Sequence, residues 1–483
     1  MNLPQAVSRP ILLAALIFAM TVLPAQGQAQ NILIVGPDGQ FSTLEAALAA
    51  AETGDVIEVH GGVYPAPLVV NKTVTLIGIG RPVIDGRGKG SLVLLNAPEG
   101  VFKGFVVRGS GQSLAHEDTG IVIQAPRVTV ADNVLEDVMF GIYFANAPDG
   151  IAQNNIIVGK PLELSMRGDG IRVWYSDHVQ LIGNEITLGR DTLIWYANHI
   201  TIRGNHIHDN RYGLHFMYNK NAIVENNVIE DNAVGAYMMY SSGLEMTGNH
   251  FIHNRGASGY GMAFKDMDHA QVTDNLFIDN VTAVYLDNSP SLVDEYNAFL
   301  RNFIAYNDIG LMGLPSIKRN IFRDNTFLEN YQQVSVQGRG DLLGNVWNQD
   351  GVGNYWSDYV GYDADHDGLG DMPYRAEKLF ESLTDREPSL KLFAFNPASQ
   401  SIDLAASAFP ALRPDPKIID EAPKMHYVVP LGLAEPAPGA TLPAIGAALL
   451  LLSTGATVSL LAWRGKRWRR SPAKRAEAVQ ARV

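Results

Sequence analysis

Cysteine is absent from the 483 residues of the chain. Its absence excludes disulfides, thiolate metal sites and a cysteine nucleophile. A site for copper or another soft metal would therefore have to use methionine and histidine. Basic residues are scarce outside the two ends, and residues 30–463 carry a net charge of −21. So acidic a body argues against a nucleic-acid partner and fits cations, basic partners or simple solubility.

Long apolar runs are placed at the two ends of the chain. Residues 1–29 have Arg9 as their one charge, followed by a short apolar run, which is typical of a cleaved signal peptide. Residues 441–463 are uncharged and long enough to cross a membrane as a helix. The basic tail, residues 464–483, should stay cytoplasmic. We expect an exported, periplasmic body anchored to a bacterial inner membrane by a C-terminal transmembrane helix. The alternative is a sorting tail that a protease removes.

Asparagine recurs in the middle of the chain with a base period near 22 residues. The first column holds Asn133, Asn155, Asn184, Asn205, Asn227, Asn249, Asn275, Asn297, Asn325 and Asn345. A second column, five residues later, holds Asn210, Asn232, Asn254, Asn280, Asn302 and Asn330. A stacked Asn can bond to the Asn above, to the one below and to turn backbone. Such a period is typical of one coil of a β-solenoid.

Apolar residues keep the same period and predict one continuous core. We therefore predict an all-β fold, a right-handed parallel β-helix over residues 30–375, because no coil can bury its apolar face alone. Phe41–Ala51 reads as an amphipathic helix, capped by Ser42 or Thr43, that covers the N-terminal end. Residues 376–440 are rich in Pro and Ala and read as an irregular wrapping tail and linker.

Neighbours of inward residues in a strand point outward. This register predicts an outward stripe of Trp174, Trp195, Met217 and Met239, and a second one that includes Tyr237. An exposed apolar stripe is typical of a contact surface, here for a protein, a sugar chain or Cu(I). The alternative is that loops cover these side chains.

Two groups of side chains are candidate metal ligands. His206 and His208 form an H-x-H on one strand, near several methionines, and imidazole with thioether suits copper. The acidic loop, residues 363–371, gives a more specific metal-site signal, because its carboxylates follow much of the pattern of a Ca²⁺-binding loop. Its candidate calcium ligands are Asp363, Asp365, Asp367 and Asp371. Tyr374 stands where that pattern has Glu, so a tight Asp/Gly turn is the alternative.

Three runs resemble the NosD family. They are Arg211–Tyr218 (RYGLHFMY), Gly235–Ser241 (GAYMMYS) and Gly353–Tyr359 (GNYWSDY). The likeness extends from about residue 31 to about residue 427. NosD is the periplasmic β-helix protein of nitrous oxide reductase maturation. The resemblance implies a non-catalytic role in assembling the copper centre of that reductase, together with an ABC-type ATPase and permease and a copper chaperone.

By that resemblance, the copper or partner surface would use His215, Met217, Met238 and Met239. The rival class is an enzyme on the same fold, a polysaccharide lyase or C5-epimerase. Its site would need a base and a cation for the uronate, for example Arg172 or Lys265. The sequence lacks the Asp-Pro-His-Asp run of alginate epimerases. A passive scaffold is the third class.

Overall fold

A computed structural model of the chain describes residues 31–393 and 396–430. The expected signal peptide (1–29), transmembrane helix (441–463) and basic tail (464–483) lie outside these residues. Within the described ranges, no helix is both long and apolar enough to span a membrane. The elements below belong to the compact unit that ends at Met425.

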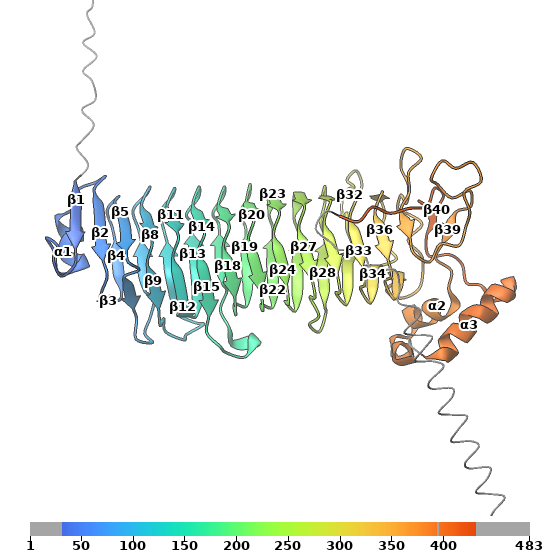
Figure 1. The fold of residues 1–483 in the computed structure, drawn as a ribbon, viewed down its shortest axis with the longest axis horizontal. Helices are drawn as coiled ribbons and strands as arrows, with labels where there is room; N and C mark the ends of the chain where they lie inside the picture. The colour runs from blue at the N-terminus through green and yellow to red at the C-terminus, as the bar shows by residue number, and fades with distance from the viewer. Residues whose placement is uncertain (1–30, 394–395, 431–483) are drawn as a thin grey trace, which may run out of the picture. The chain divides into compact units, whose positions relative to one another are not determined.

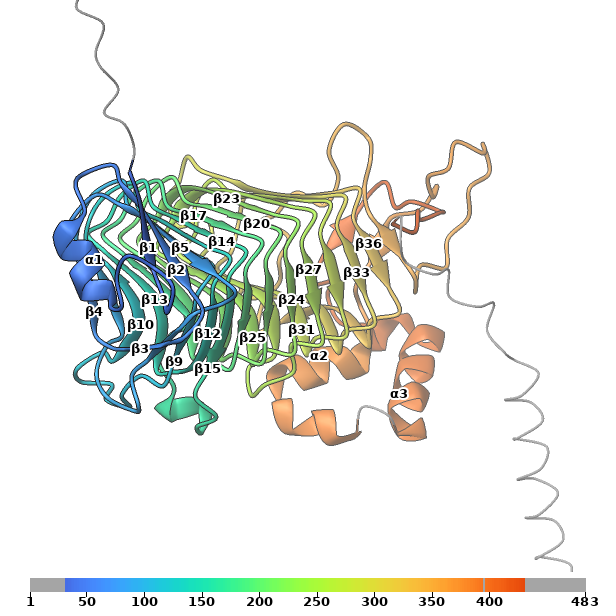
Figure 2. The same cartoon turned by 60° about the vertical axis from the view of Figure 1, so that its left-hand side comes forward.

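The chain winds as a parallel β-solenoid, so the predicted all-β architecture is confirmed (Figure 1). Each coil gives one strand to each of three sheets, which contain 13, 13 and 12 strands and are named A, B and C here. Strands three apart in sequence are therefore neighbours in a sheet, except at the two ends, where β1 pairs with β2 and β36 pairs with β38. Figure 2 shows the coils stacked one behind another between α1 and the helices α2 and α3.

The strands are given below sheet by sheet, in chain order within each sheet. Sheet A contains β1 (Ile32–Val35), β2 (Val56–His60), β5 (Thr75–Ile79), β8 (Val101–Lys103), β11 (Thr129–Ala131), β14 (Ile151–Gln153), β17 (Gln180–Ile182), β20 (Thr201–Arg203), β23 (Lys220–Glu225), β26 (Ser242–Thr247), β29 (Gln271–Thr273), β32 (Asn297–Leu300) and β35 (Asn320–Arg323). Sheet B contains β3 (Val63–Pro65), β6 (Val83–Asp85), β9 (Val106–Arg108), β12 (Val134–Val138), β15 (Ile156–Gly159), β18 (Glu185–Thr187), β21 (His206–His208), β24 (Val228–Glu230), β27 (His250–Ile252), β30 (Leu276–Ile278), β33 (Phe303–Ala305), β36 (Thr326–Leu328) and β38 (Tyr355–Trp356). Sheet C contains β4 (Leu68–Val70), β7 (Val93–Leu95), β10 (Thr119–Ile123), β13 (Phe140–Ala145), β16 (Ile171–Trp174), β19 (Asp191–Trp195), β22 (Tyr212–Met217), β25 (Val234–Met239), β28 (Tyr260–Lys265), β31 (Thr282–Asp287), β34 (Ile309–Gly313) and β37 (Gln332–Val336).

The core is a set of stacked apolar rows inside the coil. The inward row of sheet C contains Phe144, Val173, Ile194, Phe216, Met238, Phe264 and Leu286, all buried. At the N-terminal end, α1 (Leu44–Ala50) packs Leu44 and Ala47 into this core. Thr43 caps the helix, because its side chain accepts a hydrogen bond from the Ala46 N–H. The predicted capping helix is thus confirmed, with Thr43 as its cap.

Asparagine ladders tie the coils together. The first ladder runs through Asn133, Asn155, Asn184, Asn205, Asn227, Asn249, Asn275, Asn302, Asn325 and Asn354. In each step, the backbone N–H of one Asn donates to the side-chain oxygen of the next, at 2.8–3.1 Å.

The ladder assignment from sequence is right for Asn325 and Asn330 but wrong for Asn297, Asn302 and Asn345. Asn302, expected on the second ladder, continues the first, and Asn307 takes its place on the second. Asn297 and Asn345 belong to a third ladder, with Asn320 between them. The cause is a longer connection between β31 and β32, which shifts the repeat by five residues. An N-x-Phe run in β32 then imitates the expected spacing.

The C-terminal segment is more ordered than the irregular tail predicted for residues 376–440. It contains α2 (Leu379–Arg386), α3 (Pro397–Ala408) and the antiparallel pair β39 (Tyr374–Arg375) and β40 (Ile419–Asp420). Three short 3₁₀ helices, η1 (Leu164–Met166), η2 (Pro388–Phe393) and η3 (Pro410–Leu412), complete the described elements. Within the described residues, Asp420 accepts hydrogen bonds from Asn354 N and from Trp356 Nε1. Asp420 therefore ends the first ladder in place of another Asn.

Asn227→Leu should lower the free energy of unfolding by roughly 3 kcal/mol. Asn227 is fully buried, and its side-chain oxygen accepts from both nitrogens of Asn205. Leucine would leave the backbone N–H of Asn205 without an acceptor inside the protein, whereas the side-chain amide of Asn205 would keep Leu181 O and Arg203 O. Urea unfolding measures the loss. Asn226→Gly, in the same turn at a φ of +55°, is the matched control and should change little. Equal losses in the two variants would contradict the ladder's role.

Candidate functional site

The outward register predicted for sheet C is confirmed. Pairing places Trp174, Trp195, Met217, Met239, Lys265 and Asp287 in one column across six coils. We call these six residues the outer column. All of them are partly exposed. Lys265 lies 4.0 Å from Asp287, so the column is apolar over four coils and ion-paired over the next two.

A second outward column, two residues earlier on each strand, is mostly covered. It contains Arg172, Leu193, His215, Tyr237, Ala263 and Tyr285. Tyr237 is half-buried among Tyr212 and other tyrosines, and burial raises the pKa of its hydroxyl. The side chains of this second column are therefore mostly covered, as the alternative to an exposed stripe predicted. Met238, which the resemblance suggested for the surface, is buried in the core at 1% exposure and belongs to the inward row.

Buried ion pairs lie beside the second outward column, at Arg172. Asp169 accepts hydrogen bonds from Arg172 at 2.8 Å and Arg190 at 3.2 Å, and Arg172 also pairs with Glu117. Burial raises the pKa of Asp169, against the lowering effect of Arg172. These contacts occupy the arginine that a uronate-binding enzyme would need free.

His215 is oriented by the next of these pairs. Asp191, 1% exposed, lies 2.9 Å from Nδ1 of His215 and also pairs with Arg211. Burial acts to raise the pKa of Asp191, but the hydrogen bonds from His215 and Arg211 outweigh it and leave that pKa lowered. The charged carboxylate can only accept, so Nδ1 is the donor and Nε2 of the neutral ring keeps its lone pair. A carboxylate behind a histidine in this way is typical of metal-ligating histidines.

Two thioethers lie beside this histidine. Met217 follows His215 by two residues on the same side of β22, and Met239 is the register partner of Met217 on β25. Adjacent strands are about 4.8 Å apart, and residues two apart on a strand are about 6.6 Å apart. Met217 and Met239, the thioether pair, thus lie within reach of one another and near His215. Imidazole with two thioethers is a donor set for Cu(I).

A row of tyrosines borders the outer column. The sequence analysis did not predict this row. Tyr175, Tyr196, Tyr218 and Tyr240, the tyrosine row, each follow an outer-column residue and stack at ring distances of 4.9, 4.9 and 5.1 Å. All four have left-handed backbone, with φ between +46° and +59°. The equivalent positions in flanking coils are Asn146, Asp266 and Asn288, residue types that tolerate this conformation.

Left-handed backbone costs a bulky residue about 1–2 kcal/mol, so four successive tyrosines there need a reason. Stacking supplies part of it, at about 0.5–1.5 kcal/mol a pair. Tyr175, Tyr196 and Tyr218 are still 51%, 37% and 42% exposed. The signal that could have found the row was a Tyr after each Trp or Met of the predicted stripe.

His206 and His208 lie on β21 of sheet B, so the structure does not bring them together with His215 and the thioether pair. Their neighbours are carboxylates. His206 Nε2 is 2.8 Å from Glu230, and His208 Nε2 is 3.8 Å from Glu185. Ligand atoms of Glu185, His206 and His208 lie within 4.8 Å of one another.

The acidic loop brings Asp363, Asp365 and Asp367 to the same mutual distance, but not Asp371. Its carboxylates already accept backbone hydrogen bonds: Asp363 from His366 N and Gly368 N, and Asp371 from Ala364 N. These bonds agree with the alternative of an Asp/Gly turn. Calcium binding there stays a prediction.

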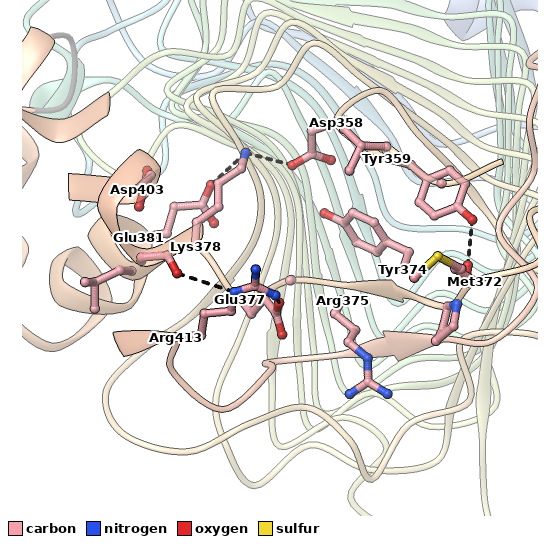
Figure 3. Close-up of a pocket in the computed structure, with 16 residues that line it drawn as sticks. Asp358, Tyr359, Met372, Tyr374, Arg375, Glu377, Lys378, Glu381, Asp403 and Arg413 are labelled. Carbon is pink, nitrogen blue, oxygen red and sulfur yellow. Dashed lines mark hydrogen bonds and ion pairs between the residues drawn. The ribbon is translucent and has the colours of Figure 1, made fainter. Parts of the chain in front are cut away.

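A cavity of about 500 Å³ lies in the C-terminal segment between β39, α2 and α3 (Figure 3). Lys378 bridges Asp358 and Glu381, at 2.7 and 3.3 Å, and Arg413 pairs with Glu377. Figure 3 draws these contacts as dashed lines. None of the side chains proposed above lines this cavity. Its ion pairs hold α2 to the rest of the segment.

Comparison with known proteins decides the family. A family model described as "Periplasmic copper-binding protein (NosD)" matches residues 150–361. A relative from Pseudomonas aeruginosa, named "Probable ABC transporter binding protein NosD", is 30% identical over 396 residues, covering 78% of this chain and 89% of that protein. The chain belongs to the NosD family.

Other similar proteins include a second NosD and two enzymes of known structure. A relative from Stutzerimonas stutzeri with the same name is 29% identical over 385 residues, covering 75% of this chain and 85% of that protein. The PL6 family alginate lyase AlyGC is 16% identical, with a TM-score of 0.41 over 66% of this chain and 53% of that one. The mannuronan C-5 epimerase AlgE6 A-module of Azotobacter vinelandii is 14% identical, with a TM-score of 0.38 over 63% and 93%.

Asp191→Asn should destabilise the protein by roughly 3 kcal/mol at neutral pH, because it leaves Arg211 without its buried countercharge. The folded-state pKa of Asp191 is lowered. Its contribution is therefore complete above the unfolded value of about 3.9 and is lost as pH falls through the folded value. Urea unfolding at pH 7 and near pH 3 should show the difference between wild type and variant shrinking in acid. A constant difference would contradict the assignment.

Proposed function

We propose that this NosD-family protein is a periplasmic accessory protein for copper-centre assembly of nitrous oxide reductase. It works with an ABC-type ATPase and permease and with a copper chaperone, by binding rather than by catalysis. Residues 1–29 direct its export, and residues 441–463 anchor it to the inner membrane. The observation that carries the proposal is the thioether pair beside His215, in a chain whose family is described as copper-binding.

Cu(I) is the form of copper that these donors favour. Thioethers are soft ligands, and the chain has no cysteine to compete with them. His215, Met217 and Met239 are the proposed ligands, and Met238 supports them from the core. The Asp191 carboxylate keeps Nε2 of His215 free for the ion. The partly exposed thioether side chains would let a transiently bound ion be passed on.

The neighbouring aromatic side chains are the proposed contact surface for the protein that brings or takes the copper. Trp174 and Trp195 precede the thioether pair in the outer column, and their rings touch edge to face at 4.5 Å. The buried indole N–H of Trp195 has no acceptor among the described residues. Trp, Tyr and Met are enriched in protein interfaces. A metal ion passed between two proteins needs both donor sets at their contact, so this continuity favours a copper-carrying partner as the occupant.

Competition against a colorimetric Cu(I) chelator tests the copper assignment on the full-length protein. Met217→Leu/Met239→Leu keeps the side-chain volume and removes both sulfur atoms. We expect Cu(I) affinity to fall at least tenfold. The control is Met166→Leu/Met372→Leu, two methionines that are 55% and 51% exposed away from the outer column, and its affinity should be unchanged. Equal affinities in the two double variants would exclude the thioether pair as ligands.

A further inference from the structure

The outward face of sheet B carries a four-residue group that the copper proposal does not use. His206 and His208 point to the same side of β21, because they are two residues apart on one strand. Register places Glu185 of β18 beside His206 on one side and Glu230 of β24 beside His208 on the other. Two imidazoles and two carboxylates thus meet on three adjacent coils.

The hydrogen bonds of this group leave two acceptors facing each other, Nε2 of His208 and a carboxylate oxygen of Glu185. Nδ1 of His208 lies 2.8 Å from the carboxylate of Asp209, which can only accept, so Nδ1 is the donor. Nε2 of the neutral ring then carries a lone pair. That atom is buried, has no hydrogen-bond partner among the described residues, and lies 3.8 Å from a Glu185 oxygen. A lone pair held against a carboxylate oxygen is stabilised by a cation between them.

We propose that Glu185, His206 and His208 bind a divalent cation of borderline softness, with Zn²⁺ as the best match and Cu²⁺ as a close second. Two histidines and one carboxylate are a donor set for such ions, with a water completing a tetrahedron. Glu230, 2.8 Å from Nε2 of His206, orients that ring. With no sulfur donor in the group, Cu(I) is disfavoured here. The site is therefore separate in chemistry and in place from the thioether pair, and it does not rest on the proposed function.

The distances are close to those that a bound ion requires. Metal–ligand distances of about 2.0–2.1 Å put tetrahedral ligand atoms about 3.3 Å apart. Here the ligand atoms lie within 4.8 Å of one another, and the His206 and His208 rings are 4.5 Å apart between centroids. Their side chains are 43% and 21% exposed, so an ion can enter from solvent. Rotation of the side chains can bring these atoms closer with the strands left in place.

The chain offers a matched control in His178 and His199. These two histidines also lie on adjacent coils and stack, at 4.8 Å between ring centroids. No carboxylate joins them in a group of ligand spacing among the described residues. Any general effect of histidine number on metal uptake therefore appears equally in both pairs.

Calorimetric titration of chelator-treated full-length protein with Zn²⁺ tests the site. Wild type should bind Zn²⁺, and His206→Gln/His208→Gln should weaken this binding at least tenfold. His178→Gln/His199→Gln and Met217→Leu/Met239→Leu should bind Zn²⁺ like wild type. Glu185→Gln, a milder change, should weaken binding with the fold intact by circular dichroism.

The proposal is overturned if wild type takes up no Zn²⁺ at micromolar concentration, or if the His206/His208 and His178/His199 double variants lose affinity equally. Failure here would leave Cu(I) binding by the thioether pair unaffected. Conversely, loss of the Cu(I) site would leave the Zn²⁺ result as it stands, so the two proposals fail separately.

Discussion

The buried asparagine ladder sets the register of the coils, and the outward columns follow from that register. Each Asn side chain hydrogen-bonds to the backbone of the coil before it, and its own backbone N–H donates to the Asn of the coil after it. A coil that slipped by one residue would break these bonds and turn every side chain of its strands to the other face. The ladder therefore fixes which residues look outward. Asp420 extends this control to the C-terminal end, where it replaces the next Asn.

Fixed register turns a repetitive sequence into precise surface columns. Over four coils, the outer column and the tyrosine row put Trp, Met and Tyr side chains at intervals of about 4.8 Å. Asp169 holds Arg172 of the second outward column through an ion pair, and Asp191 holds His215 of that column through a hydrogen bond. Ligands on such a scaffold need little reorganisation to meet an ion or a partner. The four left-handed tyrosines show that the backbone tolerates local strain where the aromatic surface is displayed.

Sequence periodicity was sufficient to predict the solenoid, the inward rows, the capping helix and the outward direction of Met217 and Met239. These features depend on local alternation and on a regular coil length. It failed where coil length changed, because Asn297 sits in an N-x-Phe run of sheet A that has the expected spacing by coincidence. Periodicity also could not show that His206 and His208 lie on a different sheet from His215, Met217 and Met239. The sheet to which a strand belongs depends on where the chain bends within each coil.

Contacts across several coils were beyond sequence reasoning altogether. Arg172 pairs with Glu117, 55 residues earlier, and Asp420 binds Asn354, 66 residues earlier. No spacing rule links such residues. Met238 was placed on the surface by family likeness, against the alternation of its own strand, and the alternation was right.

X-ray absorption at the copper K-edge distinguishes sulfur ligands from nitrogen and oxygen ligands in full-length protein loaded with one equivalent of Cu(I). If the ladder presents His215, Met217 and Met239 as described, the first shell contains two sulfur atoms and one nitrogen. A first shell of nitrogen and oxygen alone would contradict the claim that this face of the solenoid holds copper.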